Sequence, residues 1–249
     1  MRYAFFDLDH TLLPFDTQTL FCNYVLRRRP WRVLLHAVFL PFALGRVFGV
    51  VSTEKAKRAF LSYLWGMKKN DLRRLARDFA HDCVHGWIYP EMQAEILRHK
   101  HQGRKLVLNT ASPDFYAREI AAMLEFDHCV ATAVILPPKV PLLPDLAGPN
   151  NKRENKIRAM CEQAPEVARL TEEERFHCWV YSDSSADLPL LQFAGNRVLI
   201  HPMPMLLRHF PQHDVTVLKP RRPYWGRLGS LAAAVLQVLG CHRVRGPNG

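Results

Sequence analysis

The sequence predicts an α/β fold in which a parallel sheet carries helices on both of its faces. Short apolar runs are typical of buried strands, and they occur at residues 3–8, 105–110, 129–136, 178–181 and 198–200. Segments with the spacing of helices lie between them, at residues 114–124, 156–163 and 188–193. Strands that alternate with helices along a chain indicate a parallel sheet, because parallel neighbours need a crossover connection.

A long insert separates the first of these strands from the second. From Asp16 to about Lys100 the strand-like alternation disappears, and apolar residues recur at helical spacing. We therefore expect a core at residues 1–15 and 100–215, a helical cap at 16–99 and a basic tail at 216–249. The prolines between 137 and 149 predict a rigid, irregular loop.

Two carboxylates follow the first strand. Asp7 and Asp9 end the run Tyr3-Ala4-Phe5-Phe6-Asp7-Leu8-Asp9, and alternate residues of a strand point to the same face. Carboxylates this close repel each other unless a divalent cation neutralises them, or unless separated pKa values make one an acid and the other a base. Open α/β sheets bind their ligands at this edge. The pair therefore predicts chemistry there, with a capped turn or a calcium site as the alternatives.

Each later strand or helix start supplies a group suited to phosphate chemistry. Thr110 ends the second strand just before a helix whose free N–H groups favour anions. Lys156 stands at the beginning of a helix, and we prefer it to Lys152 because the helical spacing continues from Lys156. Asp183 and Asp187 lie on a strand-to-helix turn, and a pocket rich in carboxylate oxygens is what Mg²⁺ prefers.

In this order and at these strand ends, the four pieces resemble the four motifs of the haloacid dehalogenase superfamily. The pieces are Asp7-Leu8-Asp9-His10-Thr11, Thr110, Lys156, and the turn from Asp183 to Asp187. The likeness covers roughly residues 1–15 and 100–205. It implies a Rossmannoid core with a helical cap inserted after the first strand, as in the phosphoserine phosphatase-like subgroup. It also implies a Mg²⁺-dependent phosphatase.

The resemblance further implies a role for each residue. Asp7 would take the phosphoryl group as an aspartyl-phosphate, and Asp9 would protonate the leaving oxygen and later activate water. Thr110 and Lys156 would hold the phosphoryl oxygens and offset developing charge. The implied Mg²⁺ ligands are Asp7, the backbone carbonyl of Asp9, Asp183 and, directly or through water, Asp187.

Two positions depart from the family pattern. His10 stands where glycine or serine is common. Asp16 stands where serine-specific members carry a glutamate for the substrate amine, although a helix N-cap is the simpler interpretation of this aspartate.

Two apolar segments adjoin basic stretches. Residues 33–51 follow a basic stretch at 27–32, and residues 228–239 follow another at 219–227, which favours contact with an anionic membrane surface. For residues 33–51 a membrane span is a marginal alternative, because an arginine is costly inside a bilayer, and we expect instead a buried or interface-lying helix pair broken near Pro41. For residues 228–239, an interfacial anchor and a terminal helix docked on the domain remain equal alternatives.

The composition indicates the class of protein, the charge of its partner and its cellular location. Hydrophobic residues make up 48% and charged residues 23% of the 249, as in a globular protein with a core, while the net charge of +11 implies an anionic partner. The six cysteines are scattered without zinc-like spacing, so we expect reduced thiols. We expect no signal peptide, because Asp7 and Asp9 interrupt the first apolar run. This predicts a cytoplasmic protein, peripheral on or anchored to the inner membrane if the apolar segments bind lipid.

The substrate stays open between two classes. Within the subgroup, the apolar segment after a basic stretch resembles bacterial phosphatases that act on phosphatidylglycerophosphate, which implies a lipid phosphate. A soluble phosphorylated metabolite, phosphoserine-like, is the alternative.

A non-enzymatic nucleic-acid-binding module would need a recognisable reader motif, and none is found. An inactive scaffold is disfavoured, because every expected carboxylate, Thr110 and Lys156 are present. The sequence predicts no oligomeric state.

Overall fold

A parallel sheet forms the centre of the molecule. The computed structural model describes residues 2–247, so the first residue of the predicted core and the last two of the predicted tail lie outside it. The six strands pair in the order β3-β2-β1-β4-β5-β6, and every pairing is parallel. This confirms the predicted α/β fold. The strands are β1 (Tyr3–Phe6), β2 (Lys105–Pro113), β3 (His128–Thr132), β4 (Trp179–Ser182), β5 (Asn196–Ile200) and β6 (Val215–Leu218).

Helices fill the connections, and within residues 2–247 six of them precede β2 and seven follow it. In that first half they are α1 (Thr17–Arg28), α2 (His36–Val47), α3 (Thr53–Phe60), α4 (Lys69–Phe79), α5 (His85–Trp87) and α6 (Pro90–His101). The later helices are α7 (Asp114–Met123), α8 (Glu154–Gln163), α9 (Pro165–Ala168), α10 (Glu172–Phe176), α11 (Leu188–Phe193), α12 (Pro204–Leu207) and α13 (Gly226–Val238). Short 3₁₀ and π turns complete the helical segment, at η1 (Pro30–Leu35), η2 (Leu61–Leu64) and η3 (Ala80–Val84).

Alternation along β1 builds two hydrophobic cores, one on each face of the sheet. Ala4 and Phe6 belong to the larger core, and Tyr3 and Phe5 belong to the smaller one. All four side chains are fully buried. A central strand that buries both faces reads as a continuous apolar run, which is why this strand was visible in the sequence.

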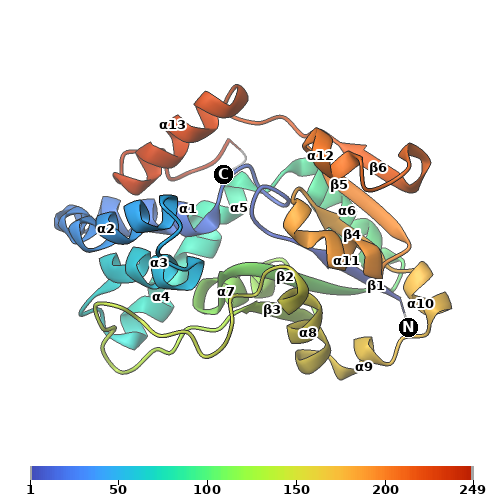
Figure 1. Cartoon of the computed structure of the whole chain (residues 1–249), viewed down its shortest axis with the longest axis horizontal. Helices are drawn as coiled ribbons and strands as arrows, with labels where there is room; N and C mark the ends of the chain where they lie inside the picture. The colour runs from blue at the N-terminus through green and yellow to red at the C-terminus, as the bar shows by residue number, and fades with distance from the viewer. Residues whose placement is uncertain (1, 248–249) are drawn as a thin grey trace.

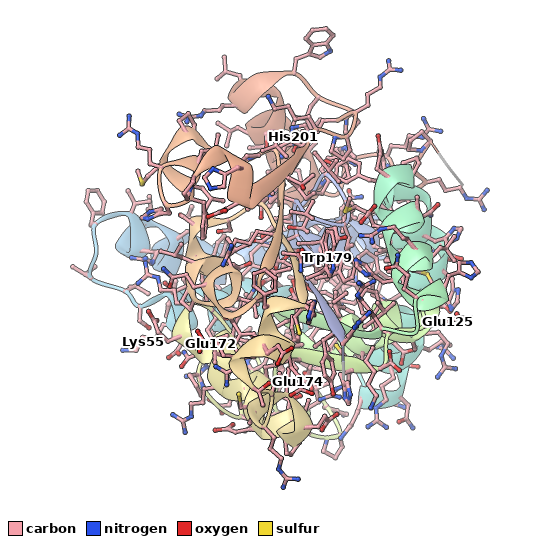
Figure 2. The ribbon with its side chains drawn as sticks, turned by 90° about the vertical axis from the view of Figure 1, so that its right-hand side faces the viewer. Lys55, Glu125, Glu172, Glu174, Trp179 and His201 are labelled. Carbon is pink, nitrogen blue, oxygen red and sulfur yellow. The ribbon has the colours of Figure 1, made fainter. Side chains whose placement is uncertain are left out.

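The helical segment from α1 to α5 lies beside the sheet. Figure 1 shows these blue and teal helices on the left of the view and the sheet on the right. The last helix of the predicted cap region, α6, instead contacts β2, and its His99 ring lies 2.7 Å from the Tyr181 hydroxyl of β4. Tyr181 in turn stacks on Phe6 of β1. Figure 2 shows Trp179, at the start of β4, near the middle of the face turned to the viewer.

The prediction of a helix pair broken near Pro41 is wrong. A single helix, α2, runs through Pro41, and the residues before it form the 3₁₀ turn η1. A proline removes one hydrogen bond from a helix interior, and in an exposed helix water can satisfy the freed carbonyl. Of the two alternatives for this segment, the buried one is wrong, because α2 has no buried residue and Phe48 after it is 78% exposed, and the interface-lying one stays a prediction.

The terminal segment forms α13, which packs on α1. Ala233 and Gln237 are buried in that contact, while Leu228 is 83% exposed and Trp225 is 94% exposed. The helix is therefore docked on the domain and still presents an apolar face to solvent. Figure 1 shows α13, in red, lying above α1 and α2. Within residues 2–247, no helix combines the length and the apolar character needed to cross a bilayer.

Other differences from the predictions are local. The strand expected at 129–136 ends at Thr132, after which Val134 makes only an isolated bridge with Leu146. Strand β6 and the short helices α9, α10 and α12 were not predicted. The edge strand β6 is short and half exposed, so it leaves a weak apolar signal in the sequence.

The proline-rich loop at 137–149 is irregular, as predicted, and it contacts the helical segment through α3. The Arg58 guanidinium of α3 forms an ion pair with Asp145 at 2.5 Å and donates a hydrogen bond to the Pro144 carbonyl at 3.0 Å. Lys139 makes an isolated bridge with Lys68, next to α4. The loop therefore connects the core to the helices that lie over the carboxyl edge of the sheet.

Candidate active site

Three of the predicted site residues lie at the carboxyl edge of adjacent strands. Asp7 follows β1 directly, and its backbone N–H donates to the Tyr181 carbonyl at 3.0 Å, which continues the pairing with β4. Asp183 follows β4 directly, and Thr110 lies toward the end of β2. Because β2, β1 and β4 are neighbours, their polar ends meet at the edge where open α/β sheets bind ligands.

A buried lysine joins two of the carboxylates. The Lys156 ammonium, carried by α8, lies 2.6 Å from Asp7 Oδ1 and 2.8 Å from Asp187 Oδ2. All three side chains are at least nine-tenths buried. The Ser182 hydroxyl donates a further bond to Asp187 Oδ2 at 2.8 Å. Lys152 is exposed, so of the two lysines considered from the sequence it is Lys156 that lies beside Asp7.

A threonine links the first carboxylate to the last motif. The Thr11 hydroxyl lies 3.3 Å from Asp7 Oδ2 and 3.5 Å from Asp183 Oδ1, and it accepts a bond from the Asp183 backbone N–H at 3.1 Å. Thr11 is fully buried. The sequence reasoning gave Thr11 no role, although its position two residues after Asp9 was part of the motif.

The site holds an excess of negative charge. Burial raises the pKa of Asp7 well above its usual range, and the neighbouring Asp187, Asp183 and Asp9 raise it further, against the lowering effect of Lys156. Burial likewise raises the pKa of Asp183 to about 6. For Lys156, burial lowers the pKa, but Asp187 and Asp7 outweigh this, so the ammonium stays charged. Lys156 pairs with only two of the four carboxylates, so the group keeps an excess of negative charge that another cation can offset.

The Asp9 side chain is turned toward the start of α1. Its Oδ1 accepts bonds from the Thr17 backbone N–H at 2.7 Å and the Thr17 hydroxyl at 2.6 Å, and its Oδ2 accepts from the Ser112 hydroxyl at 2.7 Å. These contacts hold Asp9 between the helical segment and the end of β2. Asp16 is the N-cap of α1, accepting from the backbone N–H groups of Gln18 and Thr19.

Thr110 is fully buried, and its hydroxyl accepts a bond from the Ser112 backbone N–H at 3.0 Å. Among residues 2–247, no hydrogen bond joins the Thr110 side chain to Asp7 or Lys156. The structure therefore places Thr110 on the strand beside Asp7 but does not bring it into the Lys156 group.

An amide network behind the site was missed by the sequence reasoning. The Asn151 side chain donates to Asn109 Oδ1 at 2.9 Å, to the Thr110 carbonyl at 2.8 Å and to the Val130 carbonyl at 3.1 Å. Asn109 in turn donates to the Lys156 carbonyl at 3.1 Å. These bonds fix α8, and with it Lys156, against β2 and β3. The pair Asn150-Asn151 just before a helix was the only signal in the sequence.

His10 has a left-handed backbone, with φ of 60°. This region favours glycine, and histidine is among the other residues that adopt it most often. The His10 ring contacts the Pro14 carbonyl at 3.1 Å.

Side chains alone supply only some of the oxygen ligands that a Mg²⁺ ion needs at this site. Within residues 2–247, no group of three or more His, Cys, Asp or Glu side chains is gathered closely enough to hold a metal by itself. The Asp9 carboxylate is occupied by Thr17 and Ser112, and Asp187 is engaged by Lys156. Asp7 and Asp183 remain, on either side of Thr11, as hard oxygen donors. Mg²⁺ commonly takes one or two carboxylates and completes its shell with other oxygens, so these residues fit the ion.

A lysine from the helical segment also reaches the site. Lys57 of α3 donates to the Ala111 carbonyl at 2.5 Å and to Asn150 Oδ1 at 2.7 Å. Burial lowers its pKa to about 8, and the nearby Asp16 and Asp9 raise it only partly back. No sequence motif distinguished Lys57 among 34 lysines and arginines. Lys57 reaches the site because α3 lies near the end of β2, a long-range contact that no local pattern encodes.

Comparison with curated proteins finds distant relatives over most of the chain. A probable phosphatase of Mycobacterium tuberculosis is 25% identical over 231 residues, which are 88% of this chain and 76% of the relative. A protein of Streptomyces azureus described as an inhibition of morphological differentiation protein is 24% identical over 231 residues, 88% of this chain and 79% of the relative.

Solved structures share the fold at low sequence identity. A protein of unknown function from Bordetella pertussis Tohama I superposes with a TM-score of 0.72 at 23% identity, over 87% of this chain and 97% of that one. A phosphoserine phosphatase with an analogue of the phospho-aspartyl intermediate gives 0.57 at 15% identity, over 88% of this chain and 93% of that one. A family model, described as haloacid dehalogenase-like hydrolase, matches residues 4–192. The chain therefore belongs to the haloacid dehalogenase-like hydrolases.

Proposed function

We propose that the protein is a Mg²⁺-dependent phosphomonoesterase that works through an aspartyl-phosphate on Asp7. The observation that carries the proposal is the buried contact of Lys156 with Asp7 and Asp187, beside Asp183 at the carboxyl edge of the sheet. The description of the mycobacterial relative as a probable phosphatase supports it, and so does the fold shared with phosphoserine phosphatase.

The chemistry would proceed in two steps. A carboxylate oxygen of Asp7 attacks phosphorus, the ester P–O bond breaks, and Asp9 donates a proton to the leaving oxygen. Water then attacks the aspartyl-phosphate with Asp9 accepting its proton, and the P–O bond to Asp7 breaks to release phosphate. Lys156 and Thr110 would hold the phosphoryl oxygens. Mg²⁺, when bound by Asp7, the Asp9 carbonyl and Asp183, would offset the repulsion between a phosphate dianion and the Asp7 carboxylate.

Within this reaction we propose that Lys57 draws anionic substrates to the site. Its ammonium lies between α3 and the end of β2, in the electrostatic neighbourhood of Asp9. A half-buried cation interacts more strongly with an anion than an exposed one, because water screens it less. Lys57 would therefore contribute to binding rather than to the bond-breaking step.

For the substrate we propose a phosphorylated lipid head group such as phosphatidylglycerophosphate. The apolar segment at 33–51, one of the stretches that resemble bacterial phosphatidylglycerophosphatase C, exposes apolar side chains, and so does the start of α13. Trp31, Leu44 and Phe48 are each more than half exposed around η1 and α2, as are Trp225 and Leu228 at the start of α13. Exposed apolar side chains beside arginines suit the interface of an anionic bilayer. The partner that we propose is therefore an anionic membrane surface, which these side chains would contact.

A soluble phosphorylated metabolite is the second candidate. The fold shared with phosphoserine phosphatase favours it. Asp16, however, caps α1 through Gln18 and Thr19 rather than standing free for a substrate amine.

The nucleophile assignment predicts a large loss of turnover. We expect Mg²⁺-dependent phosphate release to fall about 10⁴-fold in Asp7→Asn, as is usual when a nucleophile is removed. Lys156→Ala should be comparably inactive, and Lys152→Ala should keep near-normal turnover because Lys152 is exposed.

The substrate panel holds phosphatidylglycerophosphate and common soluble phosphomonoesters, and released phosphate is measured. If Lys152→Ala is inactive while Lys156→Ala is active, the lysine assignment is wrong; turnover by Asp7→Asn equal to wild type contradicts the enzyme proposal.

Lys57 predicts a pH-dependent KM. The ordinary pKa of lysine is near 10.4, so a value of about 8 in the folded protein means that the ammonium loses its proton as the pH rises through 8. KM for an anionic substrate should therefore rise about tenfold between pH 7 and pH 9 in the wild type. In Lys57→Met it should be high at both pH values. Lys55→Met is the matched control, since Lys55 lies on the same helix and is exposed at the edge of the molecule (Figure 2). Parallel pH profiles for wild type and Lys57→Met would contradict this role.

The membrane proposal predicts salt-sensitive binding to anionic vesicles. Wild type should sediment with vesicles of phosphatidylglycerol and phosphatidylcholine but not with pure phosphatidylcholine, and salt should weaken the binding. Phe48→Ser and Trp225→Ser should each weaken it about tenfold, the scale expected for one large apolar side chain. Phe176→Ser is the control, because Phe176 is 67% exposed on α10, on the opposite side of the molecule from α2 (Figure 1). If all of the variants bind equally, or if the wild type does not bind, the proposed membrane contact is contradicted. The soluble phosphorylated metabolite is then the remaining candidate substrate.

A further inference from the structure

A cavity of 490 Å³ lies where the helical segment joins the core. Pro14 lines it from the turn before α1, and Trp87, Ile88 and Tyr89 line it from the connection between α5 and α6. These are the two places where the chain passes between the sheet and the α1–α5 segment. We call this space the hinge cavity. None of the six predicted site residues lines it.

The C-terminal segment closes the third side of the hinge cavity. Arg221 and Arg222 line it between the core strand β6 and helix α13, which packs on α1. The Tyr224 hydroxyl donates to the Pro14 carbonyl at 2.7 Å, and the Trp87 indole donates to the Val244 carbonyl at 3.0 Å. The segment thus crosses both connections, and any molecule in the cavity contacts core, helical segment and tail at once.

Two polar groups of the hinge cavity lie next to each other without a full set of partners. Tyr89 is only 3% exposed, and the Arg222 guanidinium lies close enough to its hydroxyl to offset part of the rise in the tyrosine pKa that burial causes. Among residues 2–247, neither the Tyr89 hydroxyl nor Nε of Arg222 makes a hydrogen bond of normal geometry. A guanidinium can only donate, and a tyrosine hydroxyl readily donates. Leaving such groups unpaired is costly, and a shared anionic oxygen would satisfy both.

The rest of the lining defines the kind of anion. Arg221 adds a second positive charge, and the one carboxylate among the lining residues is that of Glu91, which is exposed on α6. The walls are otherwise apolar, formed by side chains such as Trp87, Ile88 and Pro90. A volume of this size is within the range of small-molecule sites, which combine apolar walls with a few polar groups that fix orientation.

We propose that the hinge cavity binds a small organic anion, with its phosphate, sulfonate or carboxylate group beside the adjacent Arg222 and Tyr89 side chains and its apolar body against Trp87 and Ile88. Such a ligand links the two chain connections to the C-terminal segment. It therefore favours the arrangement of the helical segment over the site that the structure shows. This site is separate from the one that we propose for the phosphate ester.

Calorimetric titration with 2-naphthalenesulfonate tests the proposal, since this probe has a fixed charge, an apolar ring system and no bond that a phosphatase can hydrolyse. We expect saturable binding at one site, and weaker binding of the neutral analogue 2-naphthol. Arg222→Gln should weaken binding of the sulfonate about tenfold and Tyr89→Phe about threefold. Arg227→Gln, an exposed arginine of the same segment, should bind like wild type.

Further variants separate the hinge cavity from other surfaces. Asp7→Asn should bind normally, because the catalytic site is not involved, and Trp225→Ser should bind normally, because the exposed apolar faces are not involved. Thermal melting checks that each variant is folded, and Arg221→Gln replaces Arg222→Gln if the latter does not fold. Absence of saturable binding to wild type, or equal binding by the wild type and the arginine variant, overturns the proposal. So does loss of binding in Asp7→Asn or Trp225→Ser. None of these results depends on whether the protein hydrolyses phosphate esters.

Discussion

The contact between Lys156 and the two carboxylates of Asp7 and Asp187 constrains the rest of the site. Charges out of water are costly unless they are paired and hydrogen-bonded, and all three groups are buried. The strand β1 supplies one carboxylate, the turn after β4 supplies the other, and α8 must deliver the ammonium between them. The amide network of Asn109 and Asn151 makes this possible, because it fixes α8 against β2 and β3. Negative charge still exceeds positive charge, which suits a site built for a divalent cation.

Much of this arrangement could be predicted from the sequence, because its signals are local. A continuous apolar run marked β1, and helix α11 begins and ends where its spacing predicted. The positions of Asp7 and Asp183 at strand ends then followed from the rule that parallel strands share an edge. Long-range features were not visible. Thr11 joins the first and last motifs, and Lys57 reaches the site only because α3 folds over β2. No local pattern encodes either contact.

The helical segment and the tail show what an apolar pattern leaves undetermined. The sequence predicted a buried or an interface-lying segment around Pro41, and the structure leaves α2 without a buried residue; α13 is both docked and apolar on its free side. Spacing identifies an apolar face without identifying what covers it. In this chain such faces lie beside basic residues, so an anionic bilayer is the partner that their chemistry suits. The C-terminal segment also ties the helical segment to the core, which gives this tail a positioning role in addition to the surface contact that we propose.

The central claim is that Asp7 becomes phosphorylated, and chemical trapping tests it directly. Wild type turning over a phosphomonoester with Mg²⁺ is quenched, reduced with borohydride, which converts an acyl phosphate to an alcohol, and digested for mass spectrometry. We expect homoserine at position 7 in the wild type with substrate, and none without substrate or in Asp7→Asn. Turnover without any reduced residue, or reduction at a different aspartate, would contradict it.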